Sequence, residues 1–153
     1  MQPIAWPFIA AEALDAGMLT FRELRGFHEA VYPGVWVPRG VELSPVSRAR
    51  ASWLWSGRRG VLAGLSASAL HGAKWVEPGS PAELVHSNRR PPRLIVVRGD
   101  RLFDGETERA DGMPVTTAAR TAFDLGRRLT VGAAVPRIDA LMNATGVTVE
   151  AIA

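Results

Sequence analysis

Two serines and a histidine lie close together in the stretch LAGLSASALHGAKW, residues 62–75, and raise the question of a serine nucleophile. If a helix begins near Ser66, His71 is five residues further on and faces another side, whereas Ser68 and His71 are three apart and can touch. The G-x-S-x-G pattern of a nucleophile elbow is missing, because Gly64 begins a G-x-S-x-S sequence. We therefore predict architecture: Ser66 as a helix N-cap and His71 hydrogen-bonded at the helix end.

Metal and phosphate chemistry also lack a recognisable pattern. His28, His71 and His86 are far apart and show none of the spacings typical of zinc sites. An acidic cluster can attract a hard cation, but it lacks the EF-hand pattern and favours a solvated loop; its members are Asp100, Asp104, Glu106, Glu108 and Asp111. The sequence has no glycine-rich phosphate loop, and its lack of cysteine excludes disulfides and thiolate chemistry. We expect neither a metal nor another cofactor.

Arginine carries the remaining chemical signal. The net charge is only +3, yet Lys74 is the sole lysine among 18 Lys and Arg residues. The planar guanidinium group of arginine matches the geometry of phosphate and of guanine. A GC-rich genome that encodes arginine in place of lysine explains the same bias, so composition leaves both interpretations open.

A set of these arginines, with one histidine, is predicted to contact double-stranded DNA. Phosphate contacts would position the duplex, and side chains on a recognition helix would read its bases. A solvated basic surface is the alternative, since several glutamates are interspersed and dilute the positive field. The predicted set comprises Arg22, Arg25, His28, Arg39, Arg48, Arg58 and Arg59.

The N-terminal part of the chain must position this set. A short helix is predicted over residues 7–17, and a second begins after Thr20, where Glu23 completes a capping box. A β ribbon is expected over residues 31–41, with Arg39 at the tip of its second turn. Two short helices followed by a ribbon indicate a winged helix-turn-helix, which we assign to residues 1–43.

Residues 44–153 are predicted to form a small mixed α/β region, so that the whole chain is of the α+β class. Ser44 caps a helix whose first residue is Pro45. Strands are expected at residues 93–97 and around the turn Asp111-Gly112.

The last third of the chain is predicted to be helical. Thr117 caps a helix in which Arg120 and Asp124 form an i, i+4 pair, which contributes a few tenths of a kcal/mol if exposed. Pro136 is expected to occupy the first turn of the next helix or to kink it. Thr148 caps a final single turn, from which we expect that the α/β region is truncated at its C-terminus.

Four segments together resemble a known family: WPFIAAEALDAGMLTFRELR, VYPGVWVPRGVELSPVSRARASWLW, VLAGLSASALHGAKW and DGMPVTTAARTAFDLGRR. They are similar, in order and over nearly the whole chain, to the N-terminal half of actinobacterial, notably mycobacterial, proteins related to the AbiEi antitoxins of type IV toxin–antitoxin systems. SASALHG and VTTAARTAFDL are the most specific pieces. The resemblance implies an N-terminal winged helix that binds promoter DNA, an α/β antitoxin region, and a nucleotidyltransferase-type toxin as partner. It would place Arg22, Arg25 and Arg39 against DNA.

Longer proteins of this kind carry a C-terminal Vsr-like nuclease domain of the PD-(D/E)XK type, which needs metal-binding carboxylates and a lysine in D/E-x-K. Gly72 and Ala73 precede Lys74, so this motif is absent and we expect no enzymatic activity. The function that we predict is therefore a non-enzymatic, DNA-binding, antitoxin-like transcriptional regulator. Two alternatives stay open: a truncated, inactive specificity domain of a Vsr-like endonuclease protein, and a protein-interaction module with an exposed patch at residues 53–55.

The hydrophobic runs of the sequence are short. None approaches the roughly 20 apolar residues that a membrane helix needs. The N-terminus lacks a basic n-region, and Glu12 and Asp15 interrupt it early, so we do not predict a signal peptide. With no cysteine in the chain, we expect a cytoplasmic protein without a membrane partner.

Overall fold

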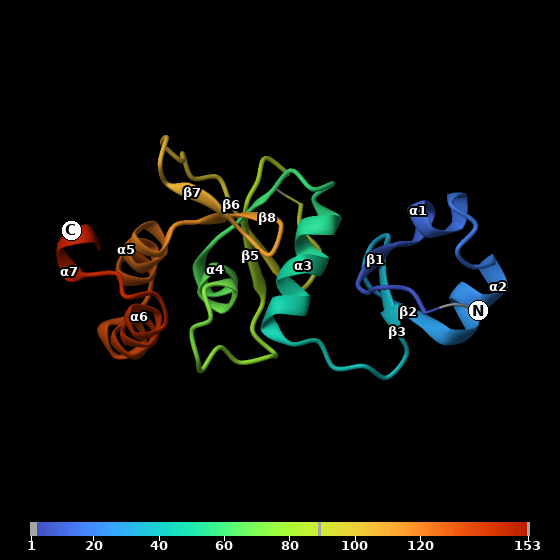
Figure 1. Ribbon diagram of the computed structural model, residues 1–153, viewed down its shortest axis with the longest axis horizontal. Coiled ribbons are helices and arrows are strands. Elements are labelled where there is room, and N and C mark those ends of the chain that lie inside the picture. Colours follow the sequence, from blue (N-terminus) through green and yellow to red (C-terminus); the bar gives the residue numbers. More distant parts are fainter. Residues whose placement is uncertain (1–2, 89, 153) are drawn as a thin grey trace.

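The computed structural model describes residues 3–88 and 90–152, which form two sheets and the helices around them (Figure 1). This mixed α/β architecture is consistent with the predicted α+β class. The N-terminal elements lie at one end of the molecule and the C-terminal helices at the other (Figure 1). The larger sheet lies between these two ends.

The N-terminal unit has the element order strand, helix, helix and hairpin: β1 (Phe8–Ile9), α1 (Ala10–Asp15), α2 (Phe21–Phe27), β2 (His28–Tyr32) and β3 (Val35–Pro38). Its antiparallel sheet has the strand order β1-β3-β2. The helix expected over residues 7–17 is shorter than predicted, because residues 8–9 pair with β3. A long-range strand pairing therefore outweighs the local helical pattern.

The predicted capping box at the start of α2 is confirmed. The Thr20 hydroxyl accepts from the Glu23 backbone N–H at 3.1 Å, and the Glu23 carboxylate accepts from the Thr20 N–H at 2.9 Å. These hydrogen bonds hold the pKa of Glu23 below its usual value. Leu24 is buried in a small core with Phe8 and Leu19, and it fixes which side of α2 faces solvent.

The larger sheet has the order β6-β5-β4-β8-β7, and its strands are β4 (Val61–Leu62), β5 (Ala82–Val85), β6 (Ile95–Arg98), β7 (Thr107–Ala110) and β8 (Met113–Thr116). β5 is parallel to β6 and β4 is parallel to β8, whereas the other pairs are antiparallel. The predicted turn between β7 and β8 is confirmed: Asp111 and Gly112 have φ of 55° and 79°, as a tight hairpin with two left-handed residues requires.

Helices cover the sheet and extend from it. They are α3 (Pro45–Trp55), α4 (Gly64–Leu70), α5 (Ala118–Arg128), α6 (Val131–Thr145) and α7 (Val149–Ile152). α3 and α4 contact β5, while α5 lies between α4 and α6 (Figure 1). The predicted caps Ser44 and Thr117 both accept a backbone N–H, from Ser47 and Arg120 respectively.

Two predictions concern the C-terminal helices. Pro136 lies inside α6, beyond its first turn, so the predicted first-turn position is wrong and the kink stays a prediction. The final turn, α7, is not isolated, because Ile152 packs against the core formed by Ala122, Leu125 and Leu141. Tertiary contact stabilises a helix that is too short to persist alone.

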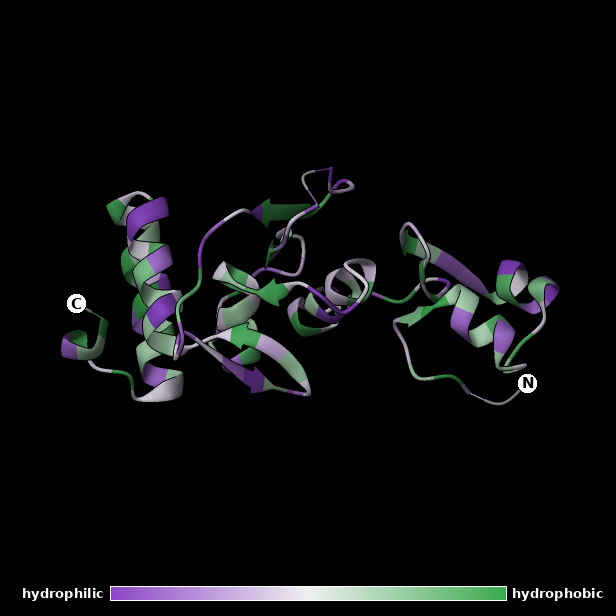
Figure 2. Cartoon of the chain, turned by 90° about the horizontal axis from the view of Figure 1, so that it is seen from above, coloured by the Kyte–Doolittle hydropathy of each residue, from purple (hydrophilic) through white to green (hydrophobic). Residues whose placement is uncertain are grey.

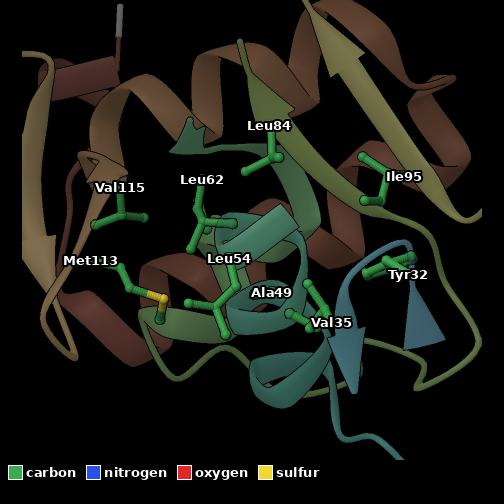
Figure 3. Packing of buried hydrophobic residues seen from close by; sticks show 11 residues of the cluster. Tyr32, Val35, Ala49, Leu54, Leu62, Leu84, Ile95, Met113 and Val115 are labelled. Carbon is green, nitrogen blue, oxygen red and sulfur yellow. The ribbon is translucent and has the colours of Figure 1, made fainter. Parts of the chain in front are cut away.

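The main core joins the two halves of the chain (Figure 3). Leu62, Leu84 and Val115 on the sheet are completely buried, and each contributes about 1.5–3 kcal/mol relative to an exposed side chain. Tyr32 and Val35, from the N-terminal hairpin, belong to the same cluster. The main core therefore extends across the predicted boundary between residues 43 and 44, while the N-terminal unit also has its own small core around Leu24.

Hydropathy follows this packing. In Figure 2, hydrophobic and hydrophilic residues alternate along the helices, so that each long helix carries residues of both kinds. Within residues 3–88 and 90–152, the helices lack the combination of length and hydropathy required to cross a bilayer.

Candidate nucleic-acid interface

The exposed side of α2 carries two of the predicted DNA-contacting arginines. Arg22 and Arg25 are exposed, while Leu24 on the opposite side is 2% exposed. The guanidinium carbon of Arg25 lies 5.7 Å from the centre of the Phe21 ring, in a cation–π contact. Neither arginine forms an ion pair within the part of the chain that the structure describes. Both guanidinium groups are therefore available to an anionic partner.

Arg39 joins these two residues from the neighbouring strand. Its Nη2 donates to the backbone carbonyl of Arg25 at 2.8 Å, at the end of α2. Arg39 is exposed and follows β3, so it does not lie at the tip of the β2–β3 hairpin as predicted. That tip is the turn Pro33-Gly34, at the other end of the two strands. We call Arg22, Arg25 and Arg39 the α2 basic face.

The tip of the hairpin is docked on the α/β region. The Tyr32 hydroxyl donates to the Leu94 carbonyl at 3.0 Å, and Tyr32 is 3% exposed (Figure 3). Burial raises the pKa of this phenol. The predicted ribbon therefore does not present its tip to a partner.

Arg48, another predicted DNA contact, takes part in the same docking. Its Nη1 lies 3.2 Å from the Tyr32 hydroxyl, and its Nε donates to the Pro78 carbonyl at 3.3 Å. The side chain is half-buried and links α3, the hairpin and the loop before β5. These contacts indicate a structural role instead of the predicted one.

Arg58 and Arg59 lie after α3, away from α2. Arg58 forms two hydrogen bonds to Glu12, at 2.6 and 2.8 Å, which lower the pKa of that carboxyl. The positive charge of Arg58 is thus neutralised by α1. Arg59 is exposed, and with burial it lowers the pKa of His86. The seven predicted residues therefore do not form one surface.

His28 is the clearest correction to the predicted set. His28 is the first residue of β2, and its side chain is buried, with 5% exposure. Its ring packs edge-on against Phe8, with ring centres 5.2 Å apart and an interplanar angle of 84°. Because this side chain is buried against Phe8, it cannot contact DNA.

In the 62–75 stretch, the contact predicted for Ser66 is wrong and the one predicted for His71 is confirmed. α4 begins at Gly64, so Ser66 is inside the helix and is not its N-cap; its hydroxyl instead accepts the Glu83 backbone N–H at 2.9 Å. Ser68 is buried without a hydrogen-bond partner in the described residues. Nε2 of His71 is hydrogen-bonded to the Thr116 carbonyl at 2.8 Å, at the helix end.

Glu83 is the helix-capping residue that sequence patterns missed. Its Oε2 accepts the Leu65 backbone N–H at 2.7 Å. A Cβ on Gly64 would lie only 2.2 Å from Oε2, and Gly64 has φ of 55°. A glycine is therefore required where the carboxylate meets the start of α4. Only the fold brings together residues that are 18 apart in sequence.

A buried ion-pair network was also missed. Asp124 is 1% exposed and lies 3.1 Å from Nε of Arg120, which also reaches Glu106 at 3.1 Å. Asp100 pairs with Arg120, Arg127 and Arg128. The predicted i, i+4 pair of Arg120 and Asp124 is confirmed, and it is buried. Two members of the predicted acidic loop cluster neutralise arginines here.

The described residues contain no group of three or more His, Cys, Asp or Glu side chains arranged to hold a metal ion. The Glu106 carboxylate accepts a hydrogen bond from Arg120, and the Glu83 carboxylate accepts one from the Leu65 backbone N–H. The α2 basic face is the candidate site, because Arg22 and Arg25 form no ion pair within the described residues and can bind a partner. Its guanidinium donors suit a polyanion.

Comparisons with known proteins add no assignment. No protein-family model matches this sequence, and a search of curated proteins finds no match.

Proposed function

We propose that this protein is a non-enzymatic DNA-binding regulator of the antitoxin-like type, and that α2 is its recognition helix. The observation that carries the proposal is the α2 basic face: three exposed arginines around one helix whose other side is buried. Winged helices commonly dock such a helix in the major groove.

The topology of the N-terminal unit supports the same proposal. Strand, helix, helix and hairpin follow in that order, and the sheet has the order β1-β3-β2. This arrangement is compatible with a winged helix-turn-helix whose second helix is α2. Because the hairpin tip is docked, the proposed contacts come from α2 and Arg39 and exclude the turn at Pro33.

The test is fluorescence anisotropy of the chain on its own upstream DNA and on a scrambled duplex, across a salt series. Three phosphate-neutralising arginines would give a log–log slope against salt of about −2.7 per bound chain. Arg22→Ala or Arg25→Ala should each weaken binding and reduce the slope by about 1.

Arg101→Ala is the matched control for Arg25→Ala. Arg101 is also exposed and also stacks on a phenylalanine, with its guanidinium carbon 5.1 Å from the Phe103 ring, but it belongs to the α/β region. The Arg101→Ala variant should bind DNA with the affinity of the wild type. Unchanged binding of both α2 variants, or no binding at low salt by the folded wild type, would refute the proposal.

The antitoxin part of the proposal rests on the sequence resemblance. Co-purification with a neighbouring nucleotidyltransferase-type protein tests it separately from DNA binding. Failure to co-purify would leave a DNA-binding regulator without that partner.

A further inference from the structure

Gly26 lies on the exposed side of α2, close to the C-terminal end of the helix. At 100° per residue its position is about 40° from that of Arg22, one turn earlier, and about 100° from that of Arg25. Gly26 is exposed, whereas Leu24 points into the core. The exposed side of α2 therefore has a position with no side chain beside the two arginines, and Phe21 and Phe27 are exposed at the two ends of the helix.

The fold does not require glycine at this position. A Cβ added at Gly26 would have nothing within 4 Å, and its φ is not in the left-handed region. Gly64 differs in both respects, since it has φ of 55° and Glu83 would collide with its Cβ. Glycine inside a helix lowers stability relative to alanine. Gly26 thus weakens α2 without a benefit to packing.

We infer that Gly26 is the point of closest approach between α2 and DNA, where the helix backbone meets base-pair edges on the floor of the major groove. Absence of a Cβ lets a backbone come closer to a ligand than any other residue allows. Arg22 and Arg25, which both precede Gly26 on the same side of the helix, would then reach bases and phosphates next to the contact. This inference rests on the proposed function and adds the position at which base pairs are read.

The test combines stability and binding, because Gly26→Ala should change them in opposite directions. The melting temperature should rise by about 1–4 °C, since alanine favours the helix. The affinity for the upstream DNA should fall by about tenfold or more, because a methyl group now separates two surfaces in contact. Gly26→Leu should lose more affinity than Gly26→Ala, since leucine is also a good helix former but larger.

Gly132→Ala is the matched control. Gly132 is an exposed glycine in α6, and an added Cβ there would also have nothing within 4 Å. This variant should gain helix stability and keep wild-type DNA affinity. Scrambled DNA is the second control: loss at Gly26 should be smaller on it, because non-specific binding depends on phosphates instead of base edges.

The outcomes separate this inference from the proposed function. Wild-type affinity in Gly26→Ala, together with weakened binding in Arg22→Ala, would overturn the close approach and leave the regulator standing. Equal losses on both duplexes would overturn the placement at the groove floor. No DNA binding by the folded wild type would overturn both.

Discussion

Removal of the Asp124 carboxylate is the most demanding test of the packing described above. Asp124 is 1% exposed, and its two oxygens lie 3.1 and 3.2 Å from Nε of Arg120. Oδ1 also accepts from Nε of Arg127 at 2.9 Å. In Asp124→Ala, Arg120 stays buried and loses its fully buried counter-charge, and the partners that remain are the more exposed carboxylates of Glu106 at 3.1 Å and Asp100 at 3.5 Å.

The expected cost follows from that burial. Removing one partner of a buried ion pair destabilises a protein by about 3–5 kcal/mol, mainly because the other charge is left without compensation. For a chain of this size, 1 kcal/mol corresponds to about 2–4 °C in melting temperature. Asp124→Ala should therefore lower the melting temperature by about 6–20 °C.

The assay is urea denaturation followed by circular dichroism, with thermal melting as a second measure. Asp104→Ala is the control, because Asp104 is an exposed aspartate in a nearby loop. Asp124→Asn, which keeps the shape and one acceptor, should fall between that control and Asp124→Ala. If the free energies of unfolding of Asp124→Ala and Asp104→Ala differ by less than about 1 kcal/mol, the buried network does not stabilise the fold as its burial indicates.

Three further predictions concern separate parts of the fold. Glu12→Gln should cost only about 0.2–1 kcal/mol at low salt, because its pair with Arg58 is exposed, and urea denaturation in about 1 M NaCl should abolish the difference; a persistent gap would contradict it. Burial and a nearby positive charge depress the pKa of His86 below 6.5, so the contribution of this residue to stability is complete above pH 6.5 and declines below it. His86→Asn should therefore flatten the pH dependence of the free energy of unfolding between about pH 7 and 5, and the same pH dependence in variant and wild type would refute this. Gly64→Ala should cost about 2–5 kcal/mol in urea denaturation, through the left-handed φ and the Glu83 carboxylate 2.2 Å from the new Cβ; a smaller cost than that of Ala at an open glycine would disprove the requirement.

Local signals in the sequence predicted local structure well. Thr20 with Glu23, Thr117, and the Asp111-Gly112 turn each form the contacts expected of them. In each case the interacting groups lie within a few residues, so the chemistry of the cap or turn is written in a short stretch. In the 62–75 stretch the same reasoning was right about the hydrogen bond of His71 at the helix end and wrong about Ser66, which lies inside α4.

Contacts between distant segments could not be predicted in this way. The bond from Tyr32 to Leu94 spans 62 residues, and the pair of Arg58 with Glu12 spans 46. Nothing near Arg48 in sequence distinguishes an arginine that binds a phenol from one that faces a ligand. The sequence therefore predicted a set of candidate arginines. Only the fold shows that the α2 basic face is exposed, whereas Arg48 and Arg58 bind other residues of the chain.

The docked hairpin has a consequence for the modularity of the molecule. Tyr32 and Val35 are buried by contacts with the second half of the chain, although they belong to the N-terminal sheet. A fragment cut after residue 43 would expose both side chains to water and tend to aggregate. Recombination that exchanges the N-terminal unit between proteins would therefore have to carry along, or recreate, the surface around Leu94. The N-terminal unit and the α/β region of such a protein are therefore expected to evolve together.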